Sequence, residues 1–323
     1  MALRQALTGV HVLEVATYLP GPACTQILAG LGARVTKVSR PGGDPLRELA
    51  PLDATYDLFN AGKTELELDL KAPEGAAALR ELASSADVLV DGLRPGALAR
   101  MGLGATALRA AQPRLIYCAL SAFGMEGVAS GRAGHDLNFV ALAGLLATTT
   151  VGGEPALPGT QLADLVSGLT AATSILAALL ERARSGVGCT LDAPMLGAAR
   201  WLMAPWYAVE QARPGVRLLT GERAYYRTYR TADGRHLAVA ALEPHFWARF
   251  CEALGRPELG PRQHEADQSA LAEEVAAVVA QRSLAAWRSV VDDLDACVTP
   301  VLTVEEAAGA GVVSMGLPVR DAG

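Results

Sequence analysis

The first 120 residues alternate short β-branched runs with helical segments, and this alternation limits the folds open to the chain. The expected strands are VHVLEV (10–15), VTKVSR (35–40), LELDL (66–70), ADVLVDG (86–92) and LIYCAL (115–120). Helical patterns separate them, such as the stretch 73–85 with a proline in its first turn. Strands separated by helices of this length predict a parallel, doubly wound sheet covered on both faces. In such sheets, ligands bind beyond the carboxyl ends of the strands.

The pattern changes beyond the last expected strand of this series. A long apolar helix is expected from Asp164 until Gly186, and a second one is expected around 195–211. Residues 225–242 are typical of an antiparallel hairpin, and three further helices are expected after it. We therefore expect an α/β fold with a large Rossmann-like domain (1–190), a linker helix (191–222) and a smaller α+β domain (223–300).

Composition narrows the class of protein and its partners. The chain has 323 residues, of which 51% are hydrophobic, which is more than one domain of about 150 residues needs. A formal net charge of -6 argues against a nucleic-acid partner, although it leaves room for a local basic pocket. The five cysteines are scattered and form no CxxC pair, as expected of reduced thiols rather than a disulfide or zinc site.

The longest uncharged apolar stretch, 165–180, is shorter than the ~20 residues that a membrane span needs. The N-terminal segment MALRQALTGVHVLEV has no long apolar region followed by a cleavage site. Together with the reduced thiols, these features predict a soluble, cytoplasmic protein that has no membrane partner.

Two residues are candidates for acid–base or nucleophilic chemistry. His135 stands in the segment AGHDLNF, directly after a glycine-rich loop and at the expected start of a helix. There the helix dipole disfavours the imidazolium ion and keeps the ring able to accept a proton. Asp164 begins the longest apolar helix, where a carboxylate can act as acid, base or nucleophile. Both also have a structural explanation, as residues that cap or line a helix start, and spacing alone favours it.

Several charged residues follow expected strands. Arg40 and Arg94 each follow a strand and precede a proline, and Lys71 ends the strand LELDL. Cations at the strand ends of a doubly wound sheet can hold phosphates, but each is equally an ordinary solvated loop charge. Glu243 follows a strand of the second domain and also suits a helix start. The glycines of LAGLGA do not form GxGxxG, so a nicotinamide site is not indicated.

A series of segments in a fixed order identifies a family. The segments are GVHVLEV, PGPACTQILAGLGARVTKVSRPGGDP, LDLKAPEG, ADVLVDGLRPG, MGLGATALRAAQPRLIYCALSAFG, AGHDLNF, LADLVSG, YYRTYRTADGRHLAVAALEPHFW and ACVTPVL. From about residue 7 to about residue 320 the chain resembles the family III CoA-transferases (the CaiB/BaiF family). Within that family it is most similar to the α-methylacyl-CoA racemases, because of the GHD motif at Gly134–Asp136, the helix start ALEPHFW and the absence of a glycine-rich loop of the GGGGQ type.

The resemblance implies roles for the candidate residues. Asp164 matches the aspartate of the family, which in transferases attacks the thioester carbonyl and becomes an aspartyl-CoA thioester. In racemases this aspartate and the histidine of the GHD motif, here His135, flank Cα of the acyl thioester and transfer its proton between faces. Glu243 matches a glutamate of the small domain that supports the histidine across the subunit boundary. The remaining matches are Arg40, Lys71 and Arg94 at the CoA phosphates and adenine, and Gly134 and Asp136 beside the thioester.

The resemblance also implies the partners. The substrate is an acyl-CoA, so coenzyme A enters as part of the substrate, and no metal or prosthetic group is needed. Backbone N–H groups at 136–138 are expected to face the enolate oxygen. The family forms an interlocked homodimer, in which residues 301–323 would return to the large domain. The chain differs from its family in its short C-terminal tail and at Ala61, where arginine is usual, so one cationic CoA contact is expected to be missing.

Three functions remain open at this point. The first is a racemase or epimerase that inverts C2 of a 2-methylacyl-CoA. The second is a CoA-transferase that moves CoA between carboxylic acids through a thioester on Asp164. The third is a CoA-binding protein without activity.

Overall fold

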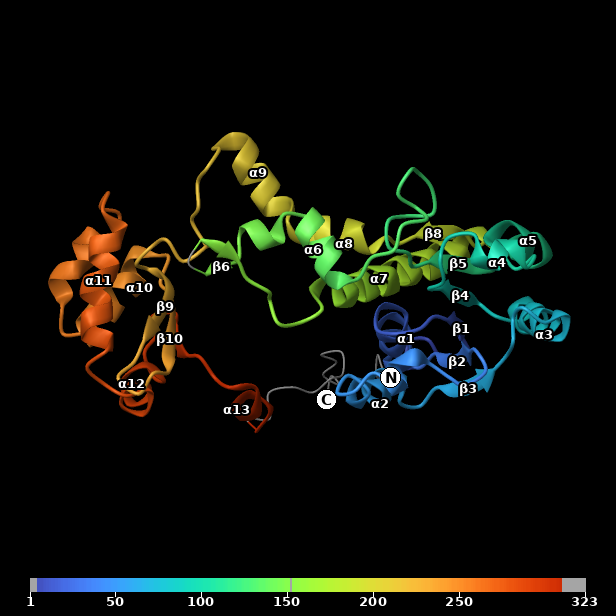
Figure 1. The fold of residues 1–323 in the computed structure, drawn as a ribbon, viewed down its shortest axis with the longest axis horizontal. Helices are drawn as coiled ribbons and strands as arrows, with labels where there is room; N and C mark the ends of the chain where they lie inside the picture. The colour runs from blue at the N-terminus through green and yellow to red at the C-terminus, as the bar shows by residue number, and fades with distance from the viewer. Residues whose placement is uncertain (1–4, 152, 310–323) are drawn as a thin grey trace. The chain divides into compact units, whose positions relative to one another are not determined.

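A computed structural model of the chain describes residues 5–151 and 153–309 and shows two compact units. One unit comprises the described residues up to Trp206, and the other begins at Tyr207. Figure 1 labels the helices and strands of both units. The expected domain boundaries at 190, 222 and 300 stay predictions. Of the expected return segment 301–323, residues 310–323 lie outside the described residues.

The first unit is built on a parallel sheet. Its strands are β1 (His11–Val15), β2 (Arg34–Ser39), β3 (Thr64–Glu67), β4 (Val88–Asp91), β5 (Ile116–Ala119) and β8 (Thr190–Asp192), in the order β3-β2-β1-β4-β5-β8. Val12 of β1 pairs with Val35 on one side and with Val88 on the other, both in parallel. The sheet therefore extends from β1 in two directions, through β2 to β3 on one side and through β4 and β5 to β8 on the other. The carboxyl ends of β1 and β4 form the switch point, where ligands of such sheets bind.

Helices cover both faces of this sheet. The helices of the first unit are α1 (Pro20–Gly30), α2 (Ala54–Asn60), α3 (Pro73–Ser84), α4 (Ala97–Arg100), α5 (Ala105–Ala111), α6 (Asp136–Leu142), α7 (Leu162–Ser185) and α8 (Met195–Leu202), and α9 (Ala204–Ala212) begins in the first unit and ends in the second. Val12 and Val90 pack with α1 and α7, whereas Leu13 and Leu89 pack with α3, α4 and α5. Alternate residues of each strand thus face opposite layers. The predicted parallel, doubly wound sheet is confirmed.

A network of buried charges lies between β1, β2 and α1. Glu14 and Lys37 are adjacent in the sheet, and Lys37 Nζ lies 2.6 Å from Glu14 Oε1. The same Nζ lies 2.9 Å from Asp44 Oδ2, and Lys63 Nζ lies 2.8 Å from Glu14 Oε2. All four charged side chains are fully buried. The hydroxyl of Thr25 donates to Glu14, so the network also fixes α1 against the sheet.

The second unit has its own sheet and core. Strands β9 (Tyr226–Arg230), β10 (His236–Ala240) and β11 (Val298–Pro300) form an antiparallel sheet in the order β11-β10-β9. Its helices are α10 (Pro244–Ala253), α11 (Gln268–Val279), α12 (Leu284–Val291) and α13 (Val304–Gly309). Trp247 and Trp287 are completely buried in its core. The expected hairpin and the helices after it are confirmed, while β11 was not expected.

Three expected boundaries were wrong. Helix α7 begins at Leu162, so Asp164 is its third residue rather than the residue that caps it. The apolar segment 195–211 divides into α8 and α9, because Pro205 supplies no N–H to continue the first helix. Strand β3 ends at Glu67, earlier than the LELDL segment suggests.

Several short elements were not predicted from the sequence. They are the strand β8, the pair β6 (Thr150–Val151) and β7 (Glu154–Pro155), and the 3₁₀ turns Pro45–Glu48, Leu145–Ala147 and Pro257–Arg262.

Helix α7 is long and apolar enough to cross a membrane by length and composition alone. It packs on the sheet and on α1 through Ala171, Ala172 and Ile175, which are buried. It is therefore a core helix of the first unit. Yet only 33% of its most apolar window is buried, so much of its apolar surface faces outward.

The buried network should contribute strongly to stability. We expect Lys37→Met to lower the free energy of unfolding by about 3–5 kcal/mol, because it leaves Asp44 buried without its cationic partner. The matched control is Arg47→Met, which removes the exposed pair with Glu65 and should cost about 1 kcal/mol or less. Urea unfolding followed by circular dichroism would measure both. Equal losses in the two variants would contradict this role of the network.

Candidate active site

A cavity of about 440 Å³ opens at the carboxyl ends of β1, β4 and β5 in the first unit. Its walls come from the segments that follow these strands and from the starts of α6, α7 and α8. The lining residues are Thr17, Tyr18, Pro20, Gly21, Gly92, Leu93, Arg94, Pro95, Leu120, Ser121, Ala122, Arg132, Ala133, Gly134, His135, Asp164 and Met195. His135 and Asp164, which are far apart in the sequence, thus border the same space at the switch point of the sheet.

His135 lies at the start of α6, as expected. It is the residue before the first helical turn, and its N–H donates to Asn138 Oδ1 at 3.0 Å. The Asn138 N–H in turn donates to the His135 carbonyl at 2.8 Å, so this N–H is paired within the first turn, and the expected role of the 136–138 amides at an enolate stays a prediction. The exposed imidazole lies nearly perpendicular to the Tyr18 ring, with 6.5 Å between the ring centroids.

Asp164 does not cap its helix, so the structural explanation for its presence there was wrong. It is the third residue of α7, and its N–H donates to Asp136 Oδ1 at 3.0 Å. Burial, and secondly the nearby charge of Asp136, raise the pKa of Asp164 to about 7. A carboxyl with this pKa is present in both its acid and its base form at neutral pH, which suits proton transfer.

Gly134 lies where a side chain would not fit. A Cβ atom placed there would lie 2.8 Å from Cε1 of Phe139 and 3.4 Å from the ring of Phe123. Phe139 is completely buried in the core formed with α7 and α8, so its ring has no room to move. Only glycine therefore allows the loop to approach α6 closely enough to bring His135 to the cavity.

The structure separates the three expected CoA-binding cations. Arg94 lines the cavity, whereas Arg40 and Lys71 are exposed residues outside its lining. Lys71 does not end a strand, which corrects the expectation. Its N–H donates to Asp69 Oδ1 at 3.0 Å, and this turn leads the chain from β3 into α3.

The other two expected site residues lie outside the cavity lining. Asp136, the first residue of α6, accepts the hydrogen bond from α7 described above. Glu243 belongs to the second unit, where it is exposed and precedes the first turn of α10. Its expected position at a helix start is confirmed, while its support of His135 stays a prediction.

Sequence reasoning missed three residues at or beneath the cavity. Asp91 ends β4, where it accepts a hydrogen bond from the Tyr117 hydroxyl at 2.5 Å and another from the Leu93 N–H at 3.0 Å. Burial raises the pKa of Asp91 to about 6. Arg132 lines the cavity, and its guanidinium lies over the Phe123 ring at 5.6 Å. Asp91 could have been identified in the sequence as a polar residue at the end of a buried strand. No feature of the sequence around Arg132 indicated its position at the cavity.

Tyr18 is the third missed residue, and its backbone is unusual. Its φ is 62°, in the left-handed region that side chains other than glycine rarely adopt. The Tyr18 N–H donates to Asp44 Oδ1 at 3.3 Å, and Asp44 belongs to the buried charge network. The network therefore holds the cavity wall that faces His135, and backbone strain of this kind concentrates at functional sites.

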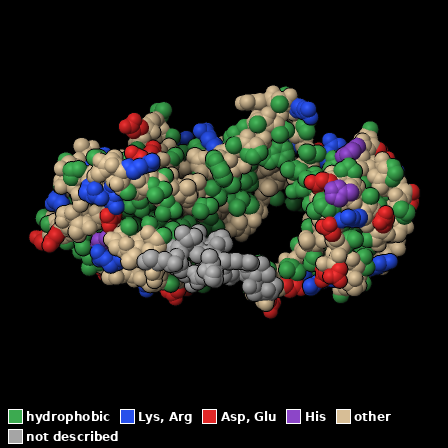
Figure 2. Space-filling view, turned by 180° about the vertical axis from the view of Figure 1, so that it is seen from behind, with side chains coloured by type: hydrophobic (Ala, Val, Ile, Leu, Met, Phe, Trp, Pro, Cys, Tyr) green, Lys and Arg blue, Asp and Glu red, His purple; other side chains and the backbone are tan. Residues whose placement is uncertain are grey.

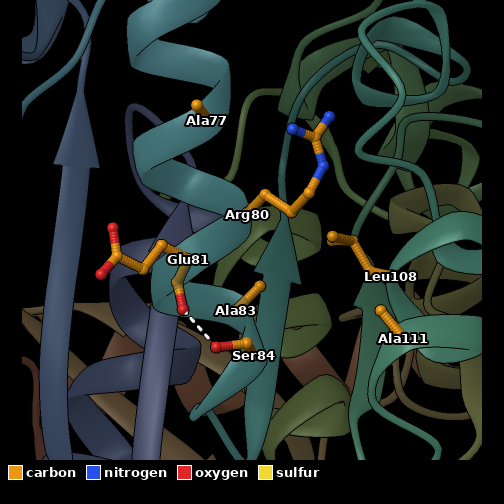
Figure 3. Close-up of a pocket in the computed structure, with 7 residues that line it drawn as sticks. All are labelled: Ala77, Arg80, Glu81, Ala83, Ser84, Leu108 and Ala111. Atoms are coloured by element: carbon orange, nitrogen blue, oxygen red, sulfur yellow. Dashed lines mark hydrogen bonds between the residues drawn. The ribbon is translucent and has the colours of Figure 1, made fainter.

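A second cavity, of about 390 Å³, lies between α3 and α5 (Figure 3). Figure 3 shows mostly short side chains around it, together with Arg80 and Glu81. Ser84 Oγ donates to the Glu81 carbonyl at 2.7 Å, within the helix. None of the expected site residues lines this cavity, so it is not the candidate active site.

Comparison with known proteins agrees with this geometry. The model of CoA-transferase family III matches residues 7–316. A human α-methylacyl-CoA racemase is 39% identical over 312 residues, which cover 93% of this chain and 79% of that protein. A mouse succinyl-CoA:glutarate CoA-transferase is 36% identical over 265 residues, which cover 78% of this chain and 60% of that protein.

Solved structures show the same fold. The crystal structure of Rv3272 from Mycobacterium tuberculosis superposes with a TM-score of 0.83 at 31% identity, covering 94% of this chain and 85% of that one. A CaiB/BaiF family protein from Brucella suis gives a TM-score of 0.82 at 28% identity, covering 95% and 86%. Sequence and fold lead to one conclusion: the chain belongs to CoA-transferase family III and is an enzyme of the racemase and transferase group.

Proposed function

We propose that the enzyme is an acyl-CoA racemase or epimerase that inverts C2 of a 2-methylacyl-CoA. The observation that carries the proposal is that His135 and Asp164 border one cavity at the switch point of the sheet. The pKa of Asp164, at about 7, lets the carboxyl give or take a proton at neutral pH. The 39% identity to a human α-methylacyl-CoA racemase supports the same reaction.

The proposed reaction is a 1,1-proton transfer between the two faces of Cα. In one direction His135 removes the α-proton and the C–H electron pair moves into the thioester as an enolate. Asp164, in its acid form, then donates a proton to the opposite face. In the reverse direction the two residues exchange roles, so no net proton is gained or lost. Glu243 is proposed to support the imidazole from the small domain.

Asp164 also suits a second candidate function, CoA transfer. Its carboxylate would attack the thioester carbonyl and form a mixed anhydride, from which the released CoA thiolate forms an aspartyl-CoA thioester. The 36% identity to a succinyl-CoA:glutarate CoA-transferase favours keeping this alternative. The two functions differ in their need for His135, which is required for proton transfer but not for attack on a carbonyl.

We propose that CoA binds through Arg94 at the cavity and through Arg40 and Lys71 outside it. The three are exposed cations that follow β4, β2 and β3, the strands around the switch point. Guanidinium groups suit phosphate oxygens because they can bind two of them at once. Gly134 and Asp136 are proposed to lie beside the thioester.

No metal or prosthetic group is proposed, and CoA enters as part of the substrate. A cytoplasmic location stays a prediction.

The subunits are proposed to form a homodimer. Figure 2 shows many hydrophobic side chains at the surface of the molecule. Four large hydrophobic side chains of α6, α7 and α8 are each at least 50% exposed: Leu142, Leu169, Leu180 and Trp201. Exposed apolar side chains on helices that contact one another are typical of a surface that another protein covers. A second copy of the chain is the partner that the family suggests.

The racemase proposal predicts exchange of the α-hydrogen. In D2O, a 2-methylacyl-CoA should gain deuterium at C2 and lose its optical purity, also after dialysis against a chelator. His135→Ala and Asp164→Asn should slow both processes about 10²-fold or more, because each removes a general acid–base group. Mass spectrometry and chiral chromatography of the released acid would measure them. The controls are the exposed residues His264→Ala and Asp57→Asn, which should exchange at the native rate.

Three outcomes would count against racemisation. Absence of exchange across several acyl chains would exclude it. Transfer of CoA to an added carboxylic acid, with a trapped thioester on Asp164 and activity retained in His135→Ala, would select the transferase. Tight CoA binding with neither reaction would leave a binding protein.

The CoA proposal predicts a loss of affinity on removal of one cation. Arg94→Gln should raise the Kd for CoA about tenfold, equivalent to about 1.4 kcal/mol, and the effect should shrink at high salt. Arg100→Gln, an exposed arginine of α4, is the control. Isothermal titration calorimetry measures both, and equal Kd values would remove Arg94 from the CoA site.

The dimer proposal predicts a mass of about 67 kDa in solution, twice the 33.5 kDa of one chain. Leu180→Glu should shift the protein towards monomer, because it places a charge on the apolar surface of α7. Leu66→Glu, on the edge strand β3, should leave the mass unchanged. Size-exclusion chromatography with light scattering distinguishes these results, and a monomeric native protein would contradict the proposal.

A further inference from the structure

Asp136 connects the two groups proposed to transfer the proton. It is the neighbour of His135 in the sequence, and its Oδ1 accepts the main-chain N–H of Asp164 at 3.0 Å. This hydrogen bond joins the first residue of α6 to the third residue of α7. It spans 28 positions of sequence, so it is a tertiary contact rather than a local turn.

The start of α7 depends on help from outside the helix. Its N-cap residue, Gln161, makes no side-chain hydrogen bond to the first turn. The first N–H groups of any helix lack partners within the helix, and each needs an acceptor from elsewhere. Asp136 supplies one at Asp164, and its negative charge also suits the positive end of the helix dipole.

We propose that Asp136 is a positioning residue that holds Asp164 through its main chain and so sets the spacing between the carboxyl and the imidazole. The inference rests on the proposed function, because it concerns the geometry of the same pair. The side chain of Asp136 lies outside the cavity lining and bonds the Asp164 main chain, so the side chain acts through Asp164, while only the Asp136 backbone is proposed to lie beside the thioester.

The charge of Asp136 has a second effect. After burial, it is the cause that raises the pKa of Asp164, since two nearby carboxylates resist ionising together. The other titratable or charged residues that line the cavity with Asp164 are Tyr18, Arg94, Arg132 and His135. Asp136 alone among the charged groups contributes a resolved shift to Asp164.

Two substitutions separate the hydrogen bond from the charge. Asp136→Asn keeps an oxygen that accepts the Asp164 N–H but removes the charge, whereas Asp136→Ala removes both. The titration of Asp164 is followed by ¹³C NMR of aspartate carboxyl groups in the full chain, and its signal is assigned by its loss in Asp164→Asn. This measurement needs no turnover. Asp57→Asn, an exposed residue of α2, serves as the matched control.

We expect the Asp164 titration midpoint to fall by about one pH unit in both Asp136 variants, because a repelling charge is lost. With the enantiomer for which Asp164 is the base, the acid limb of the pH profile should move down with it; with the other enantiomer, for which Asp164 is the acid, the basic limb should move down instead. At the pH optimum, Asp136→Ala should lower kcat for exchange at least about tenfold more than Asp136→Asn does, because only the alanine variant frees the main chain of Asp164. KM should change little in either variant.

Three results would be decisive. An unmoved titration in Asp136→Asn, with only a lower melting temperature in Asp136→Ala, would make Asp136 an ordinary helix cap and overturn the inference. Equal kcat values in the two variants would overturn the positioning role. A shifted midpoint in a protein that exchanges no thioester would support the coupling of the two carboxyls while rejecting the proposed racemase function. Should Asp136→Ala not fold, the Asn variant alone still decides the electrostatic part.

Discussion

The buried contact between Glu14 and Lys37 governs much of the first unit. It lies between adjacent strands of the sheet, and its partners extend to α1 through Thr25 and to the loop after β2 through Asp44. Charges without water are costly unless every one of them is matched, so these elements have few alternative positions. Because Asp44 also accepts the Tyr18 N–H, the same network fixes the wall that faces His135. The same contacts therefore stabilise the first unit and position the wall of the candidate active site.

The sheet and the helices that cover it were predictable because the spacing of hydrophobic residues along the chain indicates which residues are buried on the two faces of the sheet. Strands with long β-branched runs, such as β1 and β2, were identified almost to the residue. The three-residue strands β8 and β11 were missed, because so few residues carry no periodic signal and depend on pairing with distant strands. The break between α8 and α9 had a local cause at Pro205, yet the apolar pattern continues across it.

The candidate site was predictable only in part. His135 and Asp164 were found through motifs, and their location on one cavity required the fold. The assignment of Asp164 as a cap failed because an acceptor from another helix, Asp136, takes that role for its backbone. Such long-range partners leave no trace in spacing. Arg132 illustrates the same limit, since an arginine in a glycine-rich loop resembles any solvated charge until its stacking on Phe123 is known.

The bond between Asp136 and Asp164 has a consequence for how the enzyme can vary. Along the chain, the connection between the two helices carries the short strands β6 and β7. The hydrogen bond from the Asp164 N–H to Asp136 joins the first turns of the two helices directly. Insertions or deletions in this connection should therefore leave the first turns of α6 and α7, and with them His135 and Asp164, at the same cavity.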